Sequence, residues 1–168
     1  MRNLTQTTQA LSDKRDGYEL NRLLEDVYNR TKSVALSTAG LVISATTTKA
    51  KTGAAASYYI AEGKLLTLAA GLDMPAIPAT VTVVNANYTV VVFSVDKAGT
   101  VSIQSGTEAA TLAGVRWPEF DPKRATVGIL VIHPTVGAFT GGSSVLSSTA
   151  ANTVYLSPIG AFDPTANI

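Results

Sequence analysis

The chain has 168 residues, a formal net charge of +1 and no cysteine, which is enough for one domain with a core of its own. The lack of cysteine excludes disulfides and thiolate chemistry, and the small net charge offers no general attraction to nucleic acid or an anionic membrane. No apolar run is long enough to span a bilayer, and residues 1–6 lack the apolar core of a secretion signal, so we expect neither membrane insertion nor export.

The charged residues are concentrated near the N-terminus. Residues 1–38 hold 11 of the 25 charged side chains, which leaves 14 for the other 130 residues. Because an ordinary protein surface is roughly 25–35% charged, a domain so poor in charge is expected to hide surface in contacts with other chains. The alternative is a monomer whose surface is coated with Ser and Thr. We therefore divide the chain into an N-terminal arm with a helix, residues 1–38, and a β domain, residues 39–168.

A helix is predicted at the end of this N-terminal region, after a polar and mobile arm over residues 1–11. Asp16 and Glu19 have the spacing of a capping box and predict where the helix begins. Apolar positions spaced by four and three residues form one stripe, comprising Leu20, Leu24, Val27, Thr31 and Val34. This stripe predicts a helix that lies on its own β domain, or one that forms a short bundle around a symmetry axis or docks on a larger assembly.

The remaining chain is typical of β-strands. Strands are predicted over 41–49, 57–61, 64–69, 79–84, 88–95, 100–104, 125–132 and 153–157, with a loop or edge hairpin over 137–144. The runs 88–95, 100–104 and 125–132 are the richest in β-branched residues and are expected to form the core sheet. Turns are predicted at Glu62–Gly63, around the Asn residues of 85–87, and at 96–99, where Gly99 would be left-handed. The pattern predicts an all-β fold, an antiparallel β-sandwich of jelly-roll type.

Residues 107–124 are the most irregular part of the β domain and hold the single tryptophan, Trp117, close to Phe120. Pro118 lies between these two aromatic residues and Pro122 follows them. Such a pair is expected to close the open end of a sandwich, and the alternative is an anchor for an interface, where Trp is enriched.

No catalytic or metal-binding pattern is present. His133, the only histidine, directly precedes Pro134 and has no carboxylate near it in sequence, which favours a structural role. Glu119 and Asp121 have the residue type of a glycosidase pair, but few aromatic residues are available to bind a sugar. Zinc needs three or four suitable ligands, and here only scattered carboxylates remain. We expect no enzyme activity, no cofactor and no metal.

One family resemblance lies in the order of parts along the second half of the chain. The hairpin from Tyr88 to Ile103 is followed by the proline-containing link Trp117–Pro122 and by the strand run 125–132. Phe139-Thr-Gly-Gly and a late Val154-Tyr-Leu strand complete the order. This arrangement resembles tailed-bacteriophage virion structural proteins of the capsid decoration (cement) or head-fibre type. The resemblance implies a β-sandwich, usually trimeric, on the outside of a capsid, and it brings no catalytic residues.

The expected function is therefore that of a non-enzymatic virion protein that decorates or cements the capsid exterior as a homotrimer. It would be made in the host cytoplasm and bind the major capsid protein or other virion proteins, but neither nucleic acid nor membrane. The candidate oligomer or docking interface comprises Leu20, Leu24, Val27, Thr31, Val34, Trp117 and Phe120. The alternative is a receptor- or glycan-binding module of a phage head or tail fibre.

Overall fold

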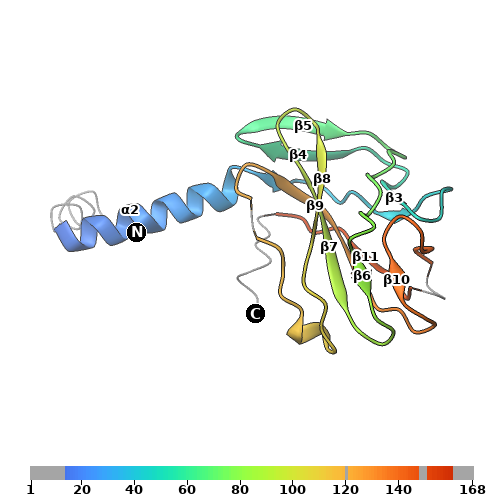
Figure 1. Ribbon diagram of the computed structural model, residues 1–168. Coiled ribbons are helices and arrows are strands. Elements are labelled where there is room, and N and C mark those ends of the chain that lie inside the picture. The colour runs from blue at the N-terminus through green and yellow to red at the C-terminus, as the bar shows by residue number, and fades with distance from the viewer. Residues whose placement is uncertain (1–13, 120, 148–150, 161–168) are drawn as a thin grey trace.

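The computed structural model describes residues 14–119, 121–147 and 151–160, and it consists of a β-rich body from which one helix projects (Figure 1). The helix is α2 (Lys14–Thr31). The strands are β1 (Val34–Ala35), β2 (Val42–Ile43), β3 (Ala50–Lys51), β4 (Ser57–Ala61), β5 (Lys64–Leu68), β6 (Thr82–Val83), β7 (Thr89–Val95), β8 (Val101–Ser105), β9 (Ala125–Ile132), β10 (Phe139–Thr140) and β11 (Val154–Leu156), with a 3-10 helix at Leu112–Gly114.

The all-β prediction is confirmed, and the described strand pairs are antiparallel. The largest sheet has the order β11-β9-β7-β8, and a second sheet has the order β1-β4-β5. Two smaller sheets pair β2 with β3 and β10 with β6. Because the strands are divided among separate sheets, the finer prediction of a jelly-roll sandwich stays a prediction.

Three of the four strands of the core sheet, β7, β8 and β9, are the β-branched runs that the sequence singles out. Strand β7 is buried along its whole length, and β9 is buried at every residue except the half-buried Val131. The turn between β7 and β8 is stabilised by Asp96, whose Oδ1 accepts hydrogen bonds of 2.9 Å from the amides of Ala98 and Thr100. Gly99 has a φ of 84°, as the turn prediction requires. Strand β9 has the predicted bounds, residues 125–132.

A β-bulge and a glycine allow the inner face of this sheet to pack closely. The register of β7 against β9 shifts between Phe93 and Ser94, opposite Gly128. Leu41 packs directly against Gly128, where an added Cβ would lie 2.0 Å from Leu41 Cδ1. Leu41 is only 5% exposed and belongs to the same hydrophobic cluster as Phe93. The absence of a side chain at Gly128 therefore makes room for a core leucine.

The irregular segment 106–124 covers the other face of the core sheet. Val115 is buried, and an added Cβ at Gly106 would contact side chains of both Val90 and Val115. Further along, Pro118 and Thr126 line one small cavity together. Trp117 is half-buried in this segment, and Phe120 lies outside the described residues, so the role of the aromatic pair stays a prediction.

Two predicted strands are shorter than the sequence indicates. The run 41–49 is not one strand, because the amide of Lys49 bonds to Thr46 O at 2.9 Å and the chain turns back to pair β3 with β2. The run 79–84 begins with a turn, so only β6 is extended, and it pairs antiparallel with the distant strand β10. In the predicted turn at 85–87, Ala86 takes the left-handed conformation with a φ of 69°.

Candidate interaction surface

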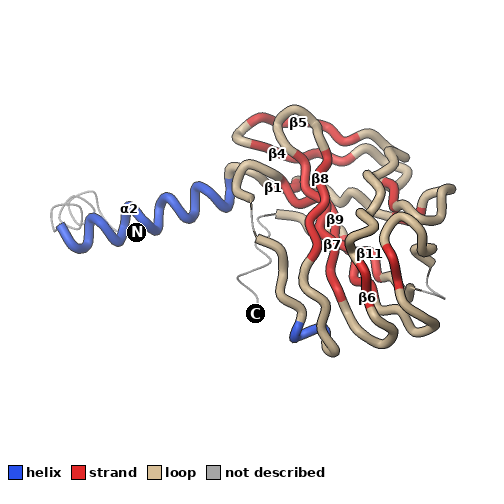
Figure 2. Tube along the Cα trace, viewed as in Figure 1, coloured by secondary structure: helices blue, strands red, loops and turns tan. Residues whose placement is uncertain are grey.

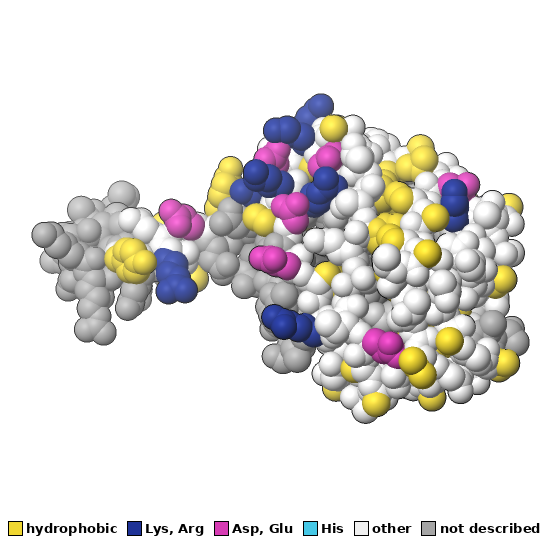
Figure 3. Space-filling model, viewed as in Figure 1, with side chains coloured by type: hydrophobic (Ala, Val, Ile, Leu, Met, Phe, Trp, Pro, Cys, Tyr) yellow, Lys and Arg dark blue, Asp and Glu magenta, His cyan; other side chains and the backbone are white. Residues whose placement is uncertain are grey.

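The most unusual surface of the molecule is the projecting helix. The described side chains of α2 leave large apolar groups open to solvent, with exposed fractions of 70% for Tyr18, 58% for Leu23, 55% for Leu24, 49% for Val27 and 64% for Tyr28. Figures 1 and 2 show α2 extending away from the body, and Figure 3 shows apolar side chains on its surface. At 1.5 Å per residue the helix is about 27 Å long, which is comparable to the width of a small domain.

Helix α2 contains every residue of the predicted stripe except Val34, and it begins earlier than predicted. Leu24, Val27 and Thr31 are exposed, and Leu20 is half-buried. Val34 is not on the helix, because α2 ends at Thr31 and Val34 is the first residue of β1. The predicted start was also wrong, since α2 already includes Lys14 and Asp16 lies inside it rather than capping it. We call the group Leu20, Leu23, Leu24 and Val27 the helix stripe.

The helix does not lie on its own β domain. Among the described elements, no strand runs alongside α2, and its neighbour in the chain, β1, enters the body directly (Figure 2). This placement contradicts the first alternative drawn from the sequence, while a short bundle or a docking helix stays a prediction. A large exposed apolar stripe is costly in water and typically marks a binding surface.

The junction between the helix and the body is held by specific hydrogen bonds. Ser33 is 4% exposed, its hydroxyl donates to Pro122 O at 2.8 Å, and it accepts from the amide of Glu62 at 3.1 Å. The amide of Gly63 also donates to Lys32 O at 2.9 Å. These bonds join the end of α2 to both the β4–β5 turn and the segment before β9. We call the residues that make these bonds, Lys32, Ser33, Glu62, Gly63 and Pro122, the helix root.

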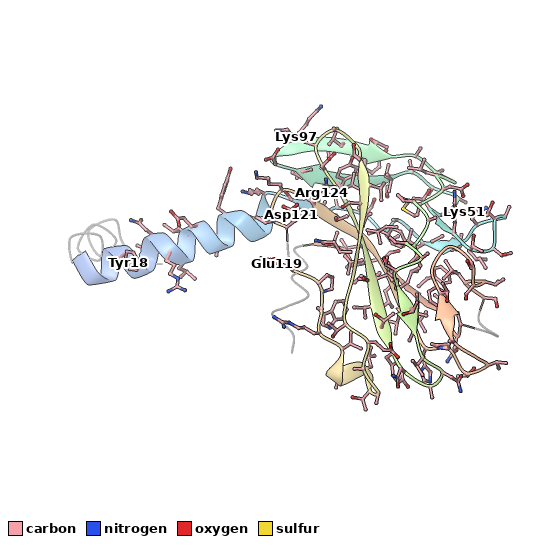
Figure 4. All side chains as sticks on the ribbon, in the orientation of Figure 1. Tyr18, Lys51, Lys97, Glu119, Asp121 and Arg124 are labelled. Atoms are coloured by element: carbon pink, nitrogen blue, oxygen red, sulfur yellow. The ribbon has the colours of Figure 1, made fainter. Side chains whose placement is uncertain are left out.

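Charged side chains surround the helix root (Figures 3 and 4). Arg124 bridges Asp96, at 3.3 Å, and Asp121, at 3.4 Å. Hydrogen bonds from the amides of Thr100 and Ala98, with the nearby Arg124 guanidinium, lower the pKa of Asp96.

Another ion pair beside the root joins Lys97 to Glu62 at 2.7 Å. The hydrogen bond between them lowers the pKa of Glu62 and raises that of Lys97. Opposite charges are thus matched locally beside the helix root.

Asp121 and His133, the residues considered above for a catalytic role, make structural contacts. Asp121 pairs with Arg124 and accepts a 2.9 Å hydrogen bond from the amide of Lys123. The ring of His133 stacks on Tyr88 with centroids 3.8 Å apart, and His133 Nδ1 lies 3.0 Å from Asn87 O. In the parts of the chain that the structure describes, no three His, Asp or Glu side chains are grouped to hold a metal ion. No described helix is long and apolar enough to cross a membrane.

The fold and this surface define a class of protein in which a β-rich body carries a projecting amphipathic helix. No family model, curated protein or solved structure matches the chain.

Proposed function

We propose that this protein is a non-enzymatic structural component of a bacteriophage particle, which decorates or cements the capsid exterior as a homotrimer. The observation that carries the proposal is the helix stripe, an apolar surface held away from the body on a helix with a well-defined root. The sequence resemblance to capsid decoration and head-fibre proteins is the reason for proposing a phage capsid as the assembly.

Two further features support a role in assembly. The β domain carries few charges, with 14 in residues 39–168, as expected for a domain that contacts other subunits. Its core strands β7 and β9 are almost wholly buried, so the body is a rigid block that can bridge neighbouring capsid subunits. In this mechanism many small apolar contacts add up, while the helix binds another copy or the capsid.

The proposal predicts that the protein raises the mechanical and thermal stability of the particle. Particles lacking it are expected to release their genome at a lower temperature and after milder osmotic shock, and adding back purified protein is expected to restore both. Equal survival of the two kinds of particle would remove the cement function.

A matched pair of variants tests whether the helix stripe mediates this activity. Leu24→Asp places a charge in the stripe, at a side chain that is 55% exposed, so the fold should be retained. We expect it to reduce retention on particles at least tenfold, because burying an unpaired carboxylate is costly. Arg22→Asp, outside the stripe, is the control and should bind as the natural protein does. Loss of binding in both variants would count against the stripe.

One observation favours a second candidate function, that of a receptor- or glycan-binding fibre module. An open depression of about 300 Å³ has a mixed lining, with Val136, Phe139 and Val145 on one hand and Ser143 and Ser144 on the other. It lies beside β10, at the end of the body remote from α2 (Figure 1). Binding of the isolated protein to host cells or to a glycan array, abolished by Val136→Asp, would favour this function over cementing.

A further inference from the structure

A second uncovered apolar surface lies on the outer face of the β1-β4-β5 sheet. The pairing places Val34 opposite Ile60, and Ile60 opposite Leu65, on one face of the sheet. Tyr58 lies on the same face by alternation, and its carbonyl accepts a 2.8 Å hydrogen bond from the amide of Leu36. We call this group, Val34, Leu36, Tyr58, Ile60 and Leu65, the outer patch.

The two faces of this sheet differ sharply in burial. Ala35, Tyr59 and Ala61 point toward the core and are 0–1% exposed. On the outer face, Leu36 is 46%, Tyr58 50% and Leu65 62% exposed. Val34 and Ile60, also on the outer face, are half-buried, so the described part of the chain covers the outer patch only in part.

The helix of the same chain is directed away from this patch. Strand β1 follows α2 after only two residues, and the hydrogen bonds of Ser33 fix the junction between them. Figures 1 and 2 show that α2 leaves the body at this point and does not fold back over β4 and β5. In the part of the chain that the structure describes, an apolar helix surface and an apolar sheet face therefore both lie open to solvent.

We propose that the helix stripe of one copy docks on the outer patch of a second copy. The contact is heterologous, because it joins different surfaces of the two molecules, and a ring of such contacts closes when the rotation between copies allows it. In a trimeric ring every stripe and every patch would be covered. This inference refines the homo-oligomer of the proposed function, but it does not depend on a role in a virion.

The exposed apolar area suits a contact that is repeated around a ring. The largest exposed side chains on the two surfaces are Leu23, Leu24, Val27 and Tyr28 on or beside the stripe, and Leu36, Tyr58 and Leu65 on the patch. These side chains are 46–64% exposed. A large aromatic side chain has a surface of roughly 150–250 Å², and an aliphatic one has less, so the apolar area that the two surfaces could bury together is on the order of 600 Å². A single contact of this size is below the roughly 1,000 Å² expected of a specific interface, so the assembly would depend on the ring. In a ring each copy makes the contact twice.

The absence of cysteine makes a direct test possible. Chains carrying Val27→Cys are mixed in equal amounts with chains carrying Leu65→Cys, at about 50 μM, and oxidised mildly. Both positions are exposed, at 49% and 62%, so neither change disturbs the core. We expect a disulfide joining positions 27 and 65 of different chains, identified by peptide mapping. The control pairs Tyr18→Cys, on the opposite side of α2 from Val27, with Leu65→Cys and should yield at least fivefold less.

The other outcomes overturn the inference. Homodimers of the Val27→Cys chain, with no disulfide between positions 27 and 65, would mean that helices bundle around an axis. A monomer by light scattering with no cross-link would mean that the stripe has a different occupant. Leu65→Asp provides a second measurement and is expected to reduce the oligomer to monomer, whereas Val84→Asp, at a position 60% exposed outside the patch, should not.

The cross-linking and particle tests can fail separately. If a protein that shows no cross-link still stabilises particles, the virion role is supported and the contact between copies is ruled out. A cross-linked oligomer that does not affect particles would keep the contact and remove the virion role.

Discussion

Replacing Ser33 by Ala should loosen the helix root without unfolding the β body. The substitution removes one hydroxyl, which donates to Pro122 O at 2.8 Å and accepts from the amide of Glu62 at 3.1 Å. A buried polar group that loses its partner costs about 1–3 kcal/mol. Glu62 is exposed and Pro122 is half-buried, so water recovers part of that loss. We therefore expect the free energy of unfolding to fall by about 2 kcal/mol, the lower part of the range for two such groups.

The effect can be measured by urea unfolding, followed through the fluorescence of Trp117, the only tryptophan. With a slope of about 2 kcal/mol per molar urea, the midpoint should fall by roughly 1 M at unchanged slope. Hydrogen exchange should also accelerate at the amides of Glu62 and Gly63, which bond to the root. The control is Ser37→Ala, which removes an acceptor for the amide of Tyr58 at a more exposed site and should cost less than about 1 kcal/mol.

A Ser33→Ala protein whose stability and amide exchange match those of the natural chain would contradict this prediction. That result would mean that the hydroxyl does not fix the direction of α2. Nothing in the helix root would then keep α2 from folding back on its own sheet.

Two further predictions concern the β body. Gly128→Ala should lower the free energy of unfolding by about 1–3 kcal/mol, the usual cost of overpacking, because the new Cβ would lie 2.0 Å from Leu41 Cδ1. Adding Leu41→Ala should recover part of this loss in a double-mutant cycle, and strict additivity of the two losses would contradict the packing account. Asp96 has a lowered pKa when folded, chiefly through the Thr100 amide, so its stabilising effect is present above its unfolded pKa near 3.8 and is lost as the pH falls through the folded pKa. Urea midpoints for Asp96→Asn should therefore depend less on pH below about pH 4 than those of the natural protein.

The core sheet was predictable because several local signals agree in these segments. β-branched residues fill β7 and β9, and the turn before β8 has both an Asp to accept backbone hydrogen bonds and a Gly for the left-handed position. Where such signals agree, strand bounds follow closely from the sequence, as residues 125–132 show.

The hairpin at β2 and β3 was missed because its turn lacks the usual signals. The chain reverses within Thr46–Lys49, where three threonines precede a lysine and neither Gly, Pro, Asn nor Asp occurs. Threonine is typical of strands, so the propensity of these residues predicts continued extension. In the turn over 85–87, the left-handed conformation is taken by Ala86 and not by one of the two Asn residues. In both cases tertiary contacts override the local preference.

The helix root was also beyond the reach of sequence analysis. Ser33 is bonded to a carbonyl 89 residues later in the chain, and nothing in its sequence neighbourhood distinguishes it from the other serines. The charge pairs of Arg124 with Asp96 and of Lys97 with Glu62 likewise join residues brought together only by the fold.

The outer patch illustrates what an apolar pattern can and cannot establish. In β4 the residues Tyr58 and Ile60 alternate with Tyr59 and Ala61, so both faces of the strand are apolar. Such a strand is expected to be buried on both sides, and the described chain buries only one. The same reasoning applies to α2, whose stripe is as apolar as a core-facing helix but lies in solvent. Two elements of one chain thus depart from expectation in the same direction, and the described residues 14–119, 121–147 and 151–160 do not supply the missing contact to either of them. The simplest source is a second copy, because it supplies the complement to both surfaces at once.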